Sequence, residues 1–162
     1  MTAWRSSIKS RTVRGLYAII DPEHCRGREP REICEAILAG GCAALQLRSK
    51  RMGDAELLRL AGDLAALCRR ASVPFWLNDR LDLALLVQAD GLHLGQDDLP
   101  VASARRLWQG RPLGRSTHSL AQAWQASREG HEVIGIGPVF PTGTKIDPDP
   151  VIHAQELAKI CG

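Results

Sequence analysis

The most constraining feature of this sequence is a regular alternation of short apolar runs with longer segments of helical periodicity. The apolar runs predict strands, and the longer segments, with apolar residues every three or four positions, predict helices. Because each strand is followed by a crossover helix, the strands must pair in parallel. The predicted strands are 13–20, 43–49, 74–79, 91–95, 112–119 and 132–140, and the predicted helices are 31–41, 54–71, 80–89, 101–108, 119–130 and 149–160.

Six strand–helix units predict one α/β domain, built either as an open doubly wound sheet or as a (β/α) barrel. Periodicity does not decide between the two. The first loop lacks a Gly-x-Gly-x-x-Gly turn, which disfavours the dinucleotide-binding version of the open sheet. We predict Asp54 and Ser119 as N-cap residues of their helices. The apolar stripe of the segment 54–71 comprises Leu57, Leu60, Ala61, Leu64 and Cys68.

Composition narrows the class of protein. The 162 residues are 44% hydrophobic and 24% charged, which is typical of a globular domain, and the net charge of +3 is too small to indicate a nucleic-acid partner. The sequence has no apolar run long enough to span a membrane. Five cysteines without a Cys-x-x-Cys pair predict reduced thiols and a cytoplasmic protein. A basic arm at 1–12 is expected to precede the domain at 13–162.

Polar side chains gather where predicted strands end. In the second strand, Leu45 and Leu47 alternate with Gln46 and Arg48, and Lys50 follows. A strand inside a parallel sheet is expected to be apolar on both faces, so one polar face indicates contact with water or a ligand. The strands that follow end in the same way, with Asn78, Asp79, Gln96, Asp97, Asp98, Ser116, Thr117, His118, Thr142, Thr144 and Lys145.

The carboxyl ends of parallel strands meet at one edge, where α/β proteins place their active sites. Asp79 and Asp98 follow neighbouring strands and suit Mg²⁺, which typically takes one or two carboxylates together with substrate phosphates. Arg48, Lys50 and Lys145 suit phosphate oxygens. The strand ends therefore predict a magnesium–diphosphate site.

Each of these residues also has a structural interpretation. Asp98 could begin a helix, and Arg48 could belong to an ion-pair network. We interpret His118 as a hydrogen-bonded structural histidine and His93 as a core or supporting residue. The convergence of the set on one edge, rather than any single residue, favours the functional interpretation.

Five motifs together resemble those of the thiamine-phosphate synthases in order and spacing: QLRSK, LNDRLDLAL, ADGLHLGQDDLP, GRSTHS and GPVFPTGTK. The resemblance covers residues 15 to 155 and implies a TIM barrel. It implies an enzyme that joins hydroxymethylpyrimidine diphosphate to thiazole phosphate, giving thiamine phosphate and pyrophosphate. A related branch, the thiazole tautomerases, shares a Ser-x-His segment but tends to lack the acid after strand four, so Asp98 favours the synthase.

The resemblance also implies roles for individual residues. Asp79 and Asp98 would hold Mg²⁺, with Asp97 a neighbour only, and Thr142 and Thr144 would bind the thiazole phosphate. Catalysis would depend on cations and donors that stabilise the leaving pyrophosphate: Arg48, Lys50, Ser116 and Lys145. The pyrimidine diphosphate would be bound by Gln46, Arg48, Lys50, Asn78, Ser116 and Lys145.

Two departures from the family pattern affect these expectations. Ser49 stands where the family commonly has an acid, and six strand–helix units are found where the family barrel has eight. We therefore expect an incomplete barrel without the last two units and their phosphate loop. Three hypotheses follow: a shortened synthase with little activity, an enzyme completed by self-association or by a complementing chain, and a pyrimidine-diphosphate-binding module without turnover.

Overall fold

In the computed structural model, which describes residues 14–141 and 150–161, six strands form one parallel sheet in chain order. The strands are β1 (Tyr17–Ile20), β2 (Ala44–Leu47), β3 (Phe75–Asn78), β4 (Gly91–Leu94), β5 (Leu113–Thr117) and β6 (Val133–Ile136). The helices are α1 (Pro30–Gly40), α2 (Asp54–Arg70), α3 (Leu81–Leu86), α4 (Val101–Leu107), α5 (Leu120–Arg128) and α6 (Ala154–Cys161), with a short 3₁₀ helix, η3 (Pro22–His24).

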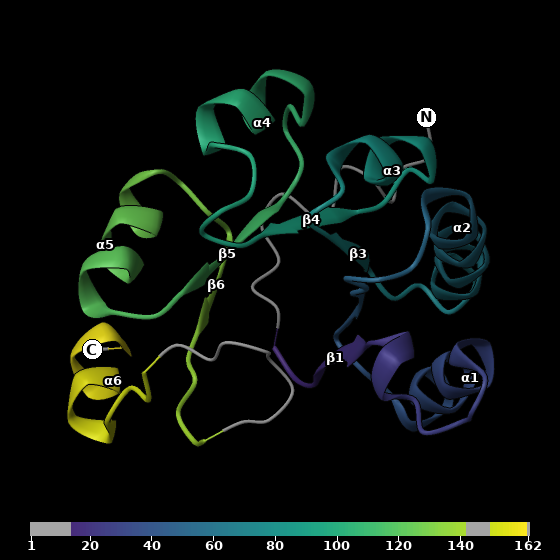
Figure 1. The fold of residues 1–162 in the computed structure, drawn as a ribbon, viewed down its shortest axis with the longest axis horizontal. Coiled ribbons are helices and arrows are strands. Elements are labelled where there is room, and N and C mark those ends of the chain that lie inside the picture. The colour runs from purple at the N-terminus through teal and green to yellow at the C-terminus, as the bar shows by residue number, and fades with distance from the viewer. Residues whose placement is uncertain (1–13, 142–149, 162) are drawn as a thin grey trace.

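The helices form an outer arc around the strands (Figure 1). Strand order equals chain order, which is the order of a (β/α) barrel and differs from that of a doubly wound sheet. The described strands thus make an incomplete barrel of six units, as the six predicted strand–helix units led us to expect. The predicted arm at 1–12 lies outside the described residues.

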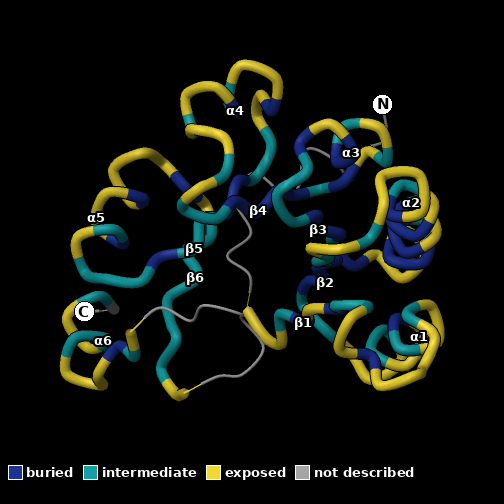
Figure 2. The backbone as a smooth tube through the Cα atoms, viewed as in Figure 1, coloured by how far each residue is buried: buried dark blue, intermediate teal, exposed yellow. Residues whose placement is uncertain are grey.

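The main apolar core lies between the sheet and the outer helices, where Figure 2 shows the buried segments. Strand residues alternate between this core and the inner face of the sheet. Leu45 and Leu77 belong to the core, whereas Gln46 and Trp76, which pair in register, are buried outside that cluster. On the inner face the Tyr17 and Trp76 rings meet edge-on, with centroids 5.9 Å apart. The alternation predicted for strand two is confirmed.

Helix α2 follows the predicted apolar stripe, and all five of its predicted members are buried. Its first residue is Asp54, and Gly53 is the N-cap residue, so the predicted Asp54 cap was wrong by one position. Asp54 instead lies in the first turn, where a carboxylate favours the positive end of the helix dipole. The predicted cap of α5 is confirmed, because Ser119 Oγ accepts a hydrogen bond from the Gln122 N–H at 3.2 Å.

The strands are shorter than predicted, although Arg48 and Asp79 still donate backbone hydrogen bonds to the neighbouring strands. β2 stops at Leu47 and β3 at Asn78, so Arg48, Lys50 and Asp79 lie in the loops that follow. Among the described residues, no helix is both long and apolar enough to cross a membrane.

We predict that Gly91→Ala destabilises the fold, because an added Cβ would lie 2.2 Å from Cδ2 of the buried Trp76. Overpacking of this kind typically costs about 1–3 kcal/mol in the free energy of unfolding, measurable by urea denaturation. Gly62→Ala is the matched control, since its Cβ would meet nothing within 4 Å inside helix α2. The control is expected to gain about 0.5–1 kcal/mol from helix propensity. Equal stability of the two variants would contradict a clash between the added Cβ and Trp76.

Candidate functional site

The centre of the candidate site is an ion pair between a lysine and an aspartate at the carboxyl edge of the sheet, next to a second aspartate. Lys50 Nζ lies 2.5 Å from Asp79 Oδ2, and the carboxyls of Asp79 and Asp98 are close enough to shift each other's pKa. These residues follow β2, β3 and β4, so three successive strands each supply one member. The structure therefore brings together both predicted metal ligands and one predicted phosphate ligand.

Backbone geometry holds both acids in place. Asp79 has a positive φ of 62°, which non-glycine residues rarely adopt and which is typical of residues at functional sites. Its N–H donates to the carbonyl of His93 on the adjacent strand at 2.8 Å. Asp98 Oδ2 accepts from the N–H of Gly95 at 2.6 Å. Asp97, predicted to be a neighbour only, is exposed.

The two carboxyls have opposite pKa shifts. Burial, and then the hydrogen bond with Asp98, raise the pKa of Asp79 to about 6, even though Lys50 lowers it. Burial also acts to raise the pKa of Asp98, but hydrogen bonds from Asp79 and from the Gly95 N–H hold it below its ordinary value. Of the two carboxyls, Asp79 is therefore the one that is protonated first as the pH falls toward about 6.

This donor set fits a hard divalent cation. In the described part of the chain, no group of three or more His, Cys, Asp or Glu residues is placed to hold a metal. Mg²⁺ commonly needs only one or two protein carboxylates, because water and substrate phosphates complete its shell. The raised pKa of Asp79 beside Asp98 marks a place where two carboxylates repel each other, which favours such a cation.

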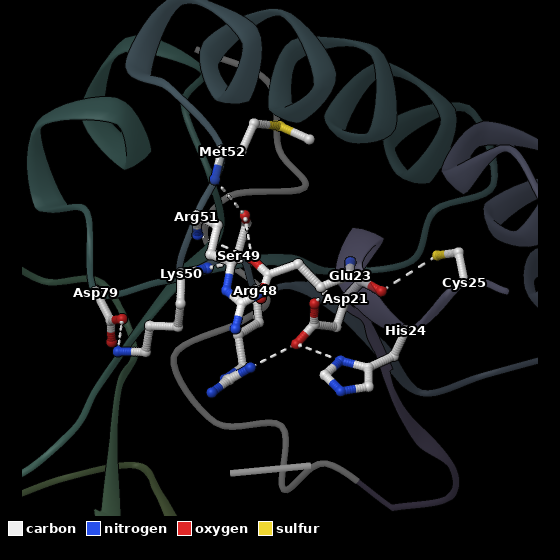
Figure 3. Close-up of polar contacts among 10 residues, drawn as sticks. All are labelled: Asp21, Glu23, His24, Cys25, Arg48, Ser49, Lys50, Arg51, Met52 and Asp79. Atoms are coloured by element: carbon white, nitrogen blue, oxygen red, sulfur yellow. Dashed lines mark hydrogen bonds and ion pairs between the residues drawn. The ribbon is translucent and has the colours of Figure 1, made fainter. Parts of the chain in front are cut away.

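Arg48 is held apart from this centre by an acid that sequence reasoning missed. Its Nη1 lies 2.5 Å from Asp21 Oδ2, which also lies 3.3 Å from His24 Nδ1 (Figure 3). Asp21 directly follows β1, so the strand-end argument applied to strands two to six would have found it. The ion-pair interpretation of Arg48 is thus confirmed, and its side chain, 23% exposed, still lies near the edge.

Gln46 lies deeper in the sheet, on the inner face. Its side chain is 3% exposed, and its Nε2 donates to the Tyr17 hydroxyl at 2.9 Å. Burial raises the pKa of Tyr17 well above its usual value, so the phenol stays protonated. Tyr17 fixes one amide hydrogen of Gln46 and was not expected from the sequence. The pairing links residues 29 positions apart, on β1 and β2.

Ser116 is paired with a buried histidine. His93 Nε2 lies 3.0 Å from Ser116 Oγ, and the residue is 9% exposed. Burial, and then the nearby His131, lower the pKa of His93 to about 4, so the imidazole is neutral. The predicted supporting role of His93 is confirmed.

The proton of His93 can be assigned from what surrounds the ring. Among the described residues, Nδ1 has no hydrogen-bond partner. A buried hydrogen-bond donor without a partner is rarer than a buried acceptor without one. Nδ1 is therefore the acceptor, and the proton lies on Nε2. His93 then donates to Ser116, and the Ser116 hydroxyl keeps its own proton for a ligand. Without a carboxylate on Nδ1, the pair lacks the third member of a Ser-His-Asp relay.

The other predicted residues are Asn78, His118, Thr142, Thr144 and Lys145. Asn78 ends β3 and pairs in register with His93, on the same layer of the sheet. His118 is a hydrogen-bonded structural residue, as interpreted, with Nδ1 2.5 Å from the carbonyl of Gly137. The predicted Thr142, Thr144 and Lys145 lie outside the described residues.

Comparison with known proteins places this geometry in a family. A family model described as "Thiamine monophosphate synthase" matches residues 16–162. The thiamine-phosphate synthase of Chloroflexus aurantiacus is 47% identical over 145 residues, which cover 90% of this chain and 67% of that protein. That of Methanospirillum hungatei is 46% identical over 140 residues, covering 85% and 68%. The chain thus spans about two thirds of the length of these curated relatives.

Solved structures agree with the sequence relatives. The thiamine phosphate pyrophosphorylase from Pyrococcus furiosus matches with a TM-score of 0.81 and 32% identity, over 95% of this chain and 71% of that one. The dihydrodipicolinate synthase from Thermotoga maritima matches with a TM-score of 0.55 at 14% identity, over 82% and 57%, which is a likeness of fold alone.

We predict that the free energy of unfolding decreases at acid pH because of the depressed pKa of His93. Its folded pKa of about 4 lies below the roughly 6.5 of an unfolded histidine, so the unfolded chain binds the proton first as the pH falls. The contribution of neutral His93 to the free energy of unfolding is complete above about pH 6.5. It is lost as the pH falls toward 4, by roughly 3 kcal/mol. Urea unfolding at several pH values measures this. His93→Gln, which cannot titrate, should show a shallower loss than wild type.

His153→Gln is the matched control for that experiment, because its side chain is exposed. It should reproduce the wild-type dependence of unfolding free energy on pH. A His93→Gln profile parallel to wild type would refute the assignment of the acid loss to His93.

Proposed function

The chain belongs to the thiamine monophosphate synthase family, and on that premise we propose that it condenses hydroxymethylpyrimidine diphosphate with thiazole phosphate in a Mg²⁺-dependent reaction. The products are thiamine phosphate and pyrophosphate. Its curated relatives are named thiamine-phosphate synthase, so the chain is a transferase of thiamine biosynthesis. The same names do not favour the thiazole tautomerase alternative.

The observation that carries the proposal is the ion pair of Lys50 with Asp79, beside Asp98. A diphosphate bound through Mg²⁺ needs acids for the metal and cations for the phosphate oxygens within one small region, and this cluster supplies both. Asp79 and Asp98 would hold Mg²⁺, which supplies charge neutralisation of the diphosphate when bound.

Lys50 has the freedom to act on the substrate. Its side chain is 49% exposed, and it neutralises Asp79 only while the acids lack another partner. Once these acids have another cation, Lys50 is available to a phosphate oxygen as a point charge. Arg48, oriented by Asp21, offers a guanidinium from the same loop. Both cations would stabilise the negative charge that grows on the leaving group.

The bond changes need no base at the carbon that reacts. The C–O bond between the pyrimidine methylene and the diphosphate breaks, and its electron pair leaves with pyrophosphate. The thiazole nitrogen then uses its lone pair to form the C–N bond, and the positive charge ends on the thiazolium ring. The neutral His93 and the free Ser116 proton are consistent with this chemistry, because Ser116 would donate to the substrate and not attack it.

The remaining predicted ligands complete the proposal. Gln46 and Asn78 would contact the pyrimidine diphosphate from the inner face, and Lys145 would add a further cation. Thr142 and Thr144 would bind the thiazole phosphate. A cytoplasmic location is also proposed, which the free thiols of Cys25, Cys34, Cys42 and Cys68 support.

We predict that Asp98→Ala abolishes Mg²⁺-dependent binding of the pyrimidine diphosphate, because the metal would lose one of its two carboxylates. Isothermal titration calorimetry with and without Mg²⁺ measures this directly. Asp97→Ala is the matched control, because it removes the same charge from the adjacent residue, whose side chain is exposed. This variant should bind like wild type. Unchanged binding by Asp98→Ala, or equal losses in the two variants, would refute the metal assignment.

A further inference from the structure

Glu23, in the 3₁₀ helix η3 after β1, reaches across to the loop that follows β2 (Figure 3). Its Oε1 accepts from the backbone N–H of Lys50 at 3.1 Å, from the backbone N–H of Arg51 at 2.8 Å and from Ser49 Oγ at 3.3 Å. Ser49 Oγ in turn accepts from the N–H of Met52 at 3.1 Å. One carboxylate oxygen of Glu23 thus accepts hydrogen bonds from three consecutive residues of this loop, Ser49, Lys50 and Arg51.

These contacts differ from an ordinary surface ion pair. The pair between Glu23 Oε2 and Arg51 Nε is 3.7 Å long, and the Arg51 side chain is 72% exposed, so this contact adds little. Two consecutive backbone N–H groups that point at one oxygen form a concave anion-binding arrangement instead. Hydrogen bonds to an ionised acceptor are the stronger kind. The Glu23 side chain is 24% exposed and so is partly shielded from water.

The η3 helix is fixed to the same loop at a second point. Asp21 caps η3 by accepting from the Glu23 N–H at 3.1 Å with Oδ1, while its Oδ2 binds Arg48 at 2.5 Å. Two acids of one turn therefore hold two different parts of the loop. Asp21 fixes the side chain of Arg48, and Glu23 fixes the backbone of Lys50.

We infer that Glu23 is a positioning residue, which orders the loop 48–52 so that Lys50 and Arg48 face the diphosphate site. The role of these two cations rests on the proposed function, whereas the ordering of the loop does not. Glu23 touches no reacting atom. Its loss would leave the two backbone N–H groups without their acceptor and would let the Lys50 backbone move.

Limited trypsin digestion tests the ordering of the loop without any ligand. Trypsin cleaves after Lys and Arg, so the bonds after Lys50 and Arg51 are substrates whose backbone Glu23 holds, and fragment masses identify cleavage there. Glu23→Ala should speed cleavage by about tenfold, from the loss of hydrogen bonds to a charged acceptor. Glu23→Gln keeps an oxygen acceptor and should lie between wild type and Glu23→Ala.

Glu29→Ala is the matched control, because Glu29 lies in the same β1–α1 connection, is exposed and makes no capping hydrogen bond. It removes the same charge and should be cleaved at the wild-type rate. If the cleavage rates of Glu23→Ala and wild type are equal, the inference is overturned.

Calorimetric titration with Mg²⁺ and inorganic pyrophosphate then tests whether loop order serves the site. Glu23→Ala should raise the Kd about tenfold, with partial recovery in Glu23→Gln and no change in Glu29→Ala. Faster cleavage with an unchanged Kd would overturn the positioning role. If the wild-type chain binds no pyrophosphate, the proposed function fails, while faster cleavage of Glu23→Ala still supports the ordering of the loop by Glu23.

Discussion

Parallel pairing in chain order brings the carboxyl ends of all six described strands to one edge of the sheet, and the candidate site depends on this constraint. Lys50, Asp79 and Asp98 are separated by 29 and 19 positions, yet they meet because β2, β3 and β4 are successive neighbours. The same constraint explains the hydrogen bond from the Asp79 N–H to the carbonyl of His93. That bond holds Asp79 at its unusual backbone angle.

Charge balance explains how such a site remains stable without its ligands. Two neighbouring carboxylates repel each other, and here the ammonium group of Lys50, which pairs with Asp79, offsets part of that repulsion. Arg48 is balanced separately by Asp21. Within the described part of the chain, the two cations proposed to bind phosphate, Lys50 and Arg48, thus each have an acid partner before substrate binds.

Sequence reasoning succeeded where one local pattern determines the outcome. The alternation around Gln46 and the acids after strands three and four were enough to locate the edge and its residue types. The family was also identifiable, because its motifs are contiguous. The sequence alone placed Asp98 at the carboxyl edge of the sheet, just beyond Gly95. Only the resemblance to the family excluded Asp97 as a metal ligand.

What escaped prediction depends on contacts between distant segments. The partners of Arg48, Gln46 and the Lys50 backbone are Asp21, Tyr17 and Glu23, which lie 27 to 29 positions earlier on a different strand and loop. No local pattern pairs them. The Asp54 cap failed by a single residue, because Gly53 and Asp54 are both acceptable at that turn and the backbone angles decide.

The most direct test of this account is turnover by the purified chain, supplied with hydroxymethylpyrimidine diphosphate, thiazole phosphate and Mg²⁺, with the mass in solution recorded by light scattering. The account predicts equal amounts of thiamine phosphate and pyrophosphate, and no product when Mg²⁺ is chelated. Product formation that is unaffected by chelation, or no product from a chain that is folded and metal-loaded, would contradict it.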